Sequence, residues 1–144
     1  IFLNGHDVTD LIRNDIITEN VSRVSSKGPV REFLVQSQRD IAKNTSFILD
    51  GRDIGTVVFP NAKYKFFITA SPKVRAKRRF DQGEINKSLE EIEEDIIKRD
   101  YYDSHRDISP LKKADDAILV DNSDMSIDQT VDFIIGKMER EDVI

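Results

Sequence analysis

Three short, nearly continuous apolar runs constrain the fold of this chain more than any other feature. They are Phe47-Ile48-Leu49, Phe66-Phe67-Ile68 and Ala117-Ile118-Leu119-Val120. Apolar runs of this length without polar alternation are typical of strands that are covered on both faces. A helix start, the cap-and-proline pair Ser71-Pro72, follows the second run. Strands that alternate with helices indicate an α/β fold with a mostly parallel sheet.

Polar residues follow two of these runs at the point where each strand should end. The first run leads into Asp50-Gly51-Arg52-Asp53 and then Gly55, and the third leads into Asp121-Asn122-Ser123. In open α/β sheets, ligands bind beyond the carboxyl ends of the strands. A charged turn that uses glycine for tight geometry would give the same pattern. The residues alone leave both interpretations open.

A long helix predicted from about Lys87 has a core-facing stripe whose character changes along its length. The apolar positions are spaced four, three and four residues apart: Ile85, Leu89, Ile92 and Ile96. The same spacing continues into three charged positions: Arg99, Asp103 and Arg106.

Charged side chains are seldom buried unless they are paired, and an inward-facing cluster usually serves a ligand or an ion. Two arginines with one aspartate leave a net positive pocket, which Arg52 could join. Planar guanidinium groups suit phosphate or carboxylate oxygens. The alternative is an exposed pair of Arg99 and Asp103, four residues apart on a helix surface.

A second basic cluster, Lys73 to Arg79, lies on the helix that starts at Ser71-Pro72 and runs to Gln82-Gly83. Such a cluster is often a solvated helix face. Beside a phosphate site, it could instead form the base of a mobile flap that carries charge to a transferring group.

The first forty-odd residues form a small α+β unit in this interpretation. Asn4-Gly5 predicts a hairpin across residues 1–8. A helix is predicted from a Thr18 cap to Ser26, and a longer one from Pro29 to about Lys43. The expected inward face of the longer helix is Val30, Phe33, Leu34, Ser37 and Ile41. At the other end of the chain, Ser126 is expected to cap a last helix that reaches about Glu139.

Composition excludes several classes of function. The net charge of −5 makes a nucleic-acid backbone an unfavourable partner. The absence of cysteine removes disulfides, thiolate zinc sites and cysteine nucleophiles, and only His6 and His105 are available as imidazole ligands. No apolar segment approaches the ~20 residues that cross a membrane. A cytoplasmic protein is therefore expected.

Three stretches together closely resemble the bacterial cytidylate kinases, which transfer a phosphate from ATP to CMP or dCMP. They are ILDGRDIGTVVFP, KRDYYDSHRDISPLKKADDAILVDNS and SSKGPVRE. The resemblance runs in order over essentially the whole chain. It implies an α/β nucleoside-monophosphate kinase: a P-loop-kinase-like three-layer core with a mostly parallel sheet, a mobile lid and a small α+β insert that binds CMP. By position, the insert is 1–44, the core is 45–144 and the lid tip is about 80–87.

The resemblance also implies roles for individual residues toward CMP. Arg31 and Asp53, with Ser22 nearby, would read the cytosine. An aspartate suits the exocyclic amino group of cytosine and an arginine suits its ring acceptors, whereas the carbonyl of uracil would be repelled. The remaining contacts would come from Arg99 and Asp103 at the ribose, and from the catalytic pair Arg52 and Arg106 at the phosphate.

On the ATP side, the resemblance suggests Arg78 or Arg79 at the root of the lid, and Asn122 and Ser123 near the adenine. Mg²⁺ would accompany ATP without a metal ligand from this chain. The expected partners are these nucleotides alone, with neither nucleic acid nor a membrane, and the expected state is a monomer.

One required element is missing from these residues. Phosphoryl transfer of this type needs a glycine-rich loop that ends in Lys-Ser or Lys-Thr, and residues 1–144 contain none. The simplest interpretation is a fragment that lacks the first strand and the P-loop and is inactive alone. The alternatives are a non-catalytic nucleotide-binding module, a kinase for another nucleoside monophosphate, and a structural domain whose arginines pair with its own carboxylates.

Overall fold

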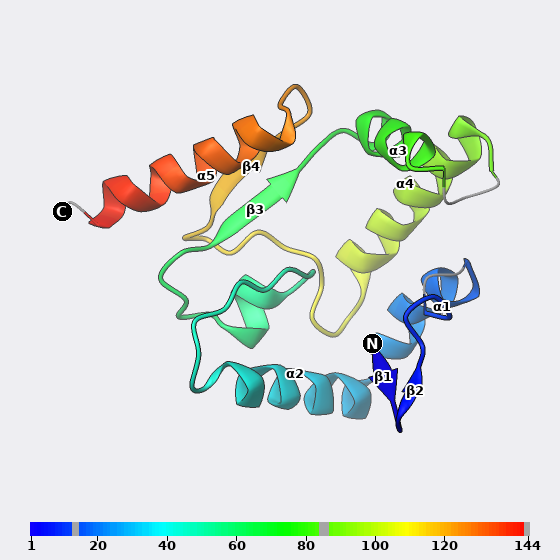
Figure 1. Ribbon diagram of the computed structural model, residues 1–144, viewed down its shortest axis with the longest axis horizontal. Helices are drawn as coiled ribbons and strands as arrows, with labels where there is room; N and C mark the ends of the chain where they lie inside the picture. Colours follow the sequence, from blue (N-terminus) through cyan, green and yellow to red (C-terminus); the bar gives the residue numbers. More distant parts are fainter. Residues whose placement is uncertain (13–14, 84–86, 143–144) are drawn as a thin grey trace.

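The computed structural model describes residues 1–12, 15–83 and 87–142. Within them the chain forms five α-helices, a short π-helix and two two-stranded sheets (Figure 1). The predicted lid tip at 80–87 includes residues 84–86, which lie outside the described part. Among the described helices, none combines the length and the hydropathy needed to span a lipid bilayer.

The chain opens with the predicted hairpin. Strands β1 (Phe2–Leu3) and β2 (His6–Asp7) pair in antiparallel fashion. Asn4 has φ 50° and Gly5 has φ 82°, the left-handed conformations that an Asn-Gly turn adopts. The hairpin prediction is confirmed.

Helix α1 (Asp15–Ser25) begins earlier than predicted. The expected start at a Thr18 cap is wrong, because the helix already includes Ile16 and Ile17. The apolar spacing from Ile17 to Val21 and Val24 is helical, so the pattern begins ahead of the presumed cap.

Helix α2 (Gly28–Ala42) has its proline in the first turn, as predicted, but it faces a different way. Its buried residues are Val35 and Ala42, whereas Phe33 and Ile41 of the predicted inward face are 72% and 77% exposed. Arg31 and Arg39 lie one turn to either side of Val35, and both form hydrogen bonds to the segment 53–58. These polar contacts turn Val35 inward in place of Phe33.

The predicted strand at 47–49 is absent, and residues 46–50 are irregular. Ile48 is fully exposed, and the described residues provide no strand to pair with this run. A strand needs the backbone hydrogen bonds of a neighbour, so an apolar run alone does not suffice. The chain continues into the π-helix η1 (Ile54–Val58), which follows Asp53 directly.

The other two apolar runs form the predicted parallel pair. Strand β3 (Phe66–Thr69) pairs with β4 (Ile118–Asp121) in a register that joins Phe66 to Ile118 and Thr69 to Asp121. Their carboxyl ends therefore meet at one edge, as expected for parallel strands. Helix α5 (Ile127–Asp142) runs beside this pair (Figure 1). The predicted Ser126 cap is confirmed, since its Oγ accepts from the N–H of Gln129 at 3.1 Å.

Helices α3 (Pro72–Asp81) and α4 (Leu89–His105) pack side by side (Figure 1). Ser71 caps α3 as predicted, and its Oγ accepts from the N–H of Val74. Ala76 of α3 and Ile92 of α4 are buried at 0% and 2% exposure. Helix α4 runs unbroken to His105, which confirms the continuity that its stripe requires.

A reciprocal capping box fixes the start of α4. The Oγ of Ser88 accepts from the N–H of Glu91, and the Glu91 carboxylate accepts from the N–H of Ser88. We expect Ser88→Ala to lower the free energy of unfolding of the whole protein by about 1 kcal/mol, because the N–H of Glu91 loses its acceptor at the start of the helix. Urea unfolding measures this change. Ser88→Thr keeps the cap and serves as the control; an equal loss in both variants would contradict the assignment.

Candidate functional site

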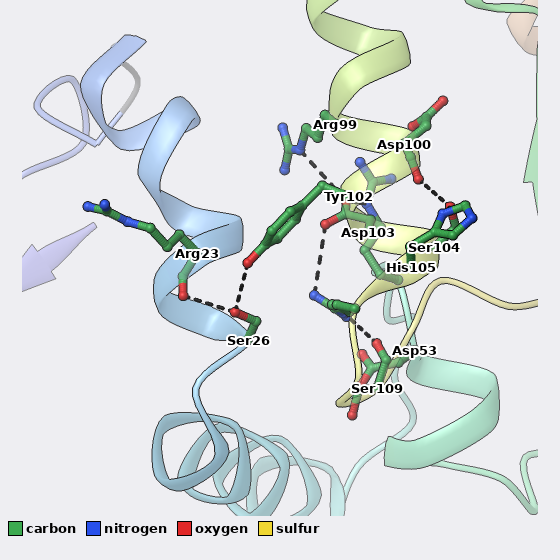
Figure 2. A network of polar contacts seen from close by, with 12 residues as sticks. Arg23, Ser26, Asp53, Arg99, Asp100, Tyr102, Asp103, Ser104, His105 and Ser109 are labelled. Atoms are coloured by element: carbon green, nitrogen blue, oxygen red, sulfur yellow. Dashed lines mark hydrogen bonds and ion pairs between the residues drawn. The ribbon is translucent and has the colours of Figure 1, made fainter.

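The carboxylate of Asp103 is the centre of the arginine cluster. Its residue is 0% exposed. Arg52 Nε donates to Oδ2 at 2.9 Å, Arg99 Nε lies 3.8 Å from the same oxygen, and Arg106 Nη1 lies 3.9 Å from Oδ1. Figure 2 shows Arg99 and Asp103 of this cluster on the last turns of α4. The structure thus brings together the three arginines that the sequence singled out, from α4, its C-cap and the 50–53 turn.

The cluster carries more positive than negative charge. Burial is the main cause that lowers the pKa of Arg99, and repulsion from Arg52 and from Arg79 lowers it further, against the opposing attraction of Asp103 and Asp100. Arg99 Nε and Asp103 Oδ1 are buried without a hydrogen-bond partner. Guanidinium groups with excess positive charge and an unused N–H donor favour an anion that supplies several oxygens.

The turn after α4 holds Arg106 in place. The side chain of Arg106 is 6% exposed, and its Nε donates to the carbonyl of Ser109 at 2.6 Å. Ser109 adopts φ 51°, a left-handed conformation that is uncommon for a residue other than glycine. The N–H of Leu111 donates to the carbonyl of Asp103 at 2.7 Å, which ties the turn back to the helix.

A second buried ion pair lies next to the first along the chain. Arg31 of α2 donates to Oδ1 of Asp53, which is 3% exposed. Asp53 Oδ2 and Arg31 Nε are also buried without a hydrogen-bond partner. Arg52 and Asp53 are consecutive, so one peptide group joins the arginine cluster to this second pair.

Gly51 and Gly55 lie where a Cβ atom would come too close to a neighbouring side chain. A Cβ at Gly51 would lie 2.9 Å from Cγ1 of Ile54, and a Cβ at Gly55 would lie 3.2 Å from Cδ of Lys65. The Lys65 side chain is itself 7% exposed and pairs with Asp116, so it has little freedom to move aside. The glycines let the segment fold tightly between the two ion pairs and β3.

Sequence reasoning missed a contact that joins the N-terminal unit to α4. Tyr102 reaches from α4 to Ser26, with 3.1 Å between the two hydroxyl oxygens (Figure 2). Ser26 donates its own proton to the carbonyl of Arg23, so the Tyr102 hydroxyl is the donor. Tyr102 lies beside the stripe in sequence and off its face, so helical spacing alone gave no signal for it.

The residues suggested for the ATP side form a separate group at the edge of β3 and β4. Arg78 donates to Asn122 Oδ1, to the Asn122 carbonyl and to the Met125 carbonyl, at 3.0, 2.7 and 3.3 Å. Ser123 Oγ accepts from the N–H of Ser71 at 3.0 Å. Hydrogen bonds from Ser123 hold the pKa of Asp121 below its ordinary value. Arg78 of α3 therefore binds the turn that carries Asn122 and Ser123, whereas the charge of Arg79 helps to lower the pKa of Arg99.

Two further expectations concern Ser22 and metal ions. Ser22 lies in α1, and its side chain is outside the described part of the structure. Across the described side chains, no group of three or more His, Asp or Glu residues is arranged to hold a metal ion.

Comparison with known proteins points to a single family. A family model described as cytidylate kinase matches residues 1–140. A cytidylate kinase from Halalkalibacterium halodurans is 47% identical over 143 residues, which cover 97% of this chain and 64% of the relative. One from Lactobacillus johnsonii is 52% identical over 134 residues, with coverage of 91% and 58%. The chain thus spans somewhat less than two thirds of the length of these relatives.

The arginine cluster predicts a response to anions. We expect Asp103→Asn to lower the free energy of unfolding of the whole protein by about 3 kcal/mol, because three guanidinium groups lose their buried counter-charge. Inorganic phosphate should restore part of this loss, since it binds only the folded cluster.

Thermal unfolding over a series of phosphate concentrations measures both effects. Asp95→Asn is the matched control, because it removes a carboxylate from an exposed ion pair of the same helix. If both variants lost the same free energy of unfolding and responded equally to phosphate, the result would argue against an anion-binding cluster.

Proposed function

This chain belongs to the cytidylate kinase family, and on that basis we propose that the whole protein transfers the γ-phosphate of ATP to CMP or dCMP, giving CDP or dCDP. The observation that carries the proposal is the pair of joined clusters. One offers guanidinium groups around a single buried carboxylate, and the other offers a buried Arg31–Asp53 pair with unpartnered polar atoms.

The Arg31–Asp53 pair is proposed to bind the cytosine. Asp53 Oδ2 is free to accept from the exocyclic amino group, and Arg31 Nε is free to donate to a ring acceptor. Uracil has a carbonyl in place of the amino group, so it would place an oxygen against the carboxylate. Ser22 is proposed as a neighbouring contact on α1.

The Asp103 cluster is proposed to bind the ribose and the phosphate of CMP. Asp103 Oδ1 can accept from a ribose hydroxyl beside Arg99, since this oxygen has no hydrogen-bond partner. Arg52 and Arg106 would then donate hydrogen bonds to the phosphate oxygens. In phosphoryl transfer, catalysis consists mainly of positioning and of offsetting charge, which is the chemistry that guanidinium groups supply.

The donor nucleotide is proposed to approach from the edge of β3 and β4. Arg78 is held by the 122–125 turn, where Asn122 and Ser123 would lie near the adenine. Arg79 of α3 is then proposed to serve the transferring phosphate, because Arg78 is occupied by the turn and the charge of Arg79 contributes to lowering the pKa of Arg99. The segment 80–87 is proposed to be the lid tip, whose closure would exclude water from the reaction.

Mg²⁺ accompanies ATP in this proposal, but the residues described here do not suit it. The two buried carboxylates near the site, Asp53 and Asp103, are each paired with arginine, and arginine repels a cation. The ion would be held by the nucleotides and by a phosphate-binding loop. Residues 1–144 contain no glycine-rich loop that ends in Lys-Ser or Lys-Thr, so this chain alone should not catalyse transfer.

The finer architecture follows from the same proposal. Residues 1–44 would form the CMP-binding insert, and residues 45–144 would form most of a P-loop-kinase-like three-layer core. The parallel pair β3–β4 would then be part of a larger sheet, in which the run 47–49, with Phe47 and Ile48 exposed, could find a partner strand.

A non-catalytic nucleotide-binding module is the second candidate, and the missing donor loop is the observation that favours it. Assays of the whole protein with ATP and CMP separate the two, because a binding module would bind CMP without forming CDP. A kinase for another nucleoside monophosphate is disfavoured by the buried Arg31–Asp53 pair.

Arg106 tests the catalytic part of the proposal. We expect Arg106→Met to reduce the turnover of the whole protein with CMP at least ~100-fold, with the fold preserved, because the developing charge loses one of its guanidinium groups. Arg23→Met is the control, since the described hydrogen bond of the Arg23 side chain goes to Asn20 of the same helix, α1. Normal turnover in Arg106→Met would leave the arginines with a structural role.

Asp53 tests the proposed specificity. Calorimetric titration of the whole protein should show tighter binding of CMP than of UMP, and Asp53→Asn should reduce this preference about 10- to 100-fold, because an amide can donate to the uracil carbonyl. Equal affinity of the unchanged protein for CMP and UMP would refute the role of Asp53.

A further inference from the structure

Arg39 of α2 forms a contact that the proposed site does not use. Its Nη2 donates to the carbonyl of Val57 at 2.8 Å, and its Nε donates to the carbonyl of Val58 at 2.9 Å. These carbonyls belong to the last two residues of η1. The guanidinium fork therefore holds the C-terminal end of the π-helix with two hydrogen bonds at once.

The opposite end of η1 is held by the same helix. Asp53 is the residue that precedes η1, and its carboxylate accepts from Arg31. Arg31 and Arg39 are eight residues apart on α2, with the buried Val35 midway between them. Hydrogen bonds from α2 thus hold η1 at both ends, and Val58, the last residue of η1, is 1% exposed.

A single peptide group links Arg39 to Asp53. The carbonyl of Val57 accepts from Arg39, and the N–H of the same peptide group, that of Val58, donates to the Asp53 carbonyl at 3.3 Å. The N–H groups of Thr56 and Val57 donate to the same Asp53 carbonyl at 3.3 and 2.9 Å. A shift at the end of η1 would therefore be transmitted to the backbone of Asp53.

The conformation of η1 explains why an external clamp is needed. π-Helical turns are rare, are less favourable than α-helical turns and are frequent at functional sites. The Asp53 carbonyl is shared by three N–H groups, and the N–H of Phe59 donates to the Ile54 carbonyl at 2.8 Å, so only two consecutive π-helical hydrogen bonds set the register of this five-residue turn. Arg39 is exposed, whereas Asp53 is buried, and the described hydrogen bonds of the Arg39 side chain go to Val57 and Val58 and not to the Arg31–Asp53 pair.

We propose that Arg39 is a positioning residue for base recognition: by clamping η1 through the Val57 and Val58 carbonyls, it fixes where the carboxylate of Asp53 stands relative to Arg31. This inference rests on the proposed function. It predicts that Arg39 affects the choice between cytosine and uracil without touching either base.

The experiment measures kcat/KM of the whole protein for CMP and for UMP, together with calorimetric affinities for both. Arg39→Met should reduce the preference for CMP about tenfold, through a higher KM for CMP and with a smaller change in kcat, because Arg52 and Arg106 keep their own contacts. Arg39→Lys keeps the charge but offers one donor nitrogen in place of two, so it should fall between the wild type and Arg39→Met. It also provides a milder variant if Arg39→Met does not fold.

Two further variants isolate the route of the effect. Lys43→Met removes a positive charge from the end of the same helix, where Lys43 pairs with Asp40, and should leave the preference unchanged. In an Asp53→Asn background, Arg39→Met should cause no further loss of preference, because the group that it positions is already altered.

Each outcome bears on a distinct claim. A wild-type protein that prefers CMP, with the same preference in Arg39→Met, would overturn the inference and leave the proposed function standing. A further loss in the Asp53→Asn background would also overturn it, since Arg39 would then act by another route. A wild-type protein without any preference for CMP would overturn the proposed role of Asp53, and the inference with it.

Discussion

The buried carboxylate of Asp103 is the constraint on which the rest of the site depends. A carboxylate without exposure must be compensated by nearby positive charge and hydrogen bonds, or its desolvation would destabilise the fold by several kcal/mol. The compensation comes from Arg99 and Arg106, on α4 and at its C-cap, and from Arg52 of the distant 50–53 turn. One ionised group thus fixes the position of the 50–53 turn relative to α4 and the turn that follows it.

Features that depend on local spacing could be predicted from the sequence. The charged end of the α4 stripe follows from helical periodicity, which any unbroken helix preserves. The hairpin at Asn4-Gly5 and the caps at Ser71 and Ser126 follow from backbone conformation and from short-range hydrogen bonds. The convergence of Arg52 with Asp103 is different: the argument that ligands gather beyond strand ends relied on a strand at 47–49, which the structure does not form, so it does not account for this contact.

Features that depend on a distant partner could not be predicted in this way. The run 47–49 has the composition of a buried strand, but pairing is decided by a neighbour and not by the run itself. The face of α2 was misassigned because apolar spacing favoured Phe33, whereas the bonds of Arg31 and Arg39 to the 53–58 segment decided its rotation. The Tyr102–Ser26 contact joins residues 76 positions apart and has no local signature.

The ratio of three arginines to one aspartate in the site has a physical explanation. With no carboxylate among them, three guanidinium groups would repel one another and destabilise the empty site. With a carboxylate for each arginine, an incoming anion would gain little attraction and would have to displace tightly held partners. A single buried aspartate keeps the arginines gathered and oriented, yet leaves net positive charge and the unpartnered atoms Arg99 Nε and Asp103 Oδ1. Such an arrangement would be organised before the proposed ligand arrives, so little reorganisation would remain on binding.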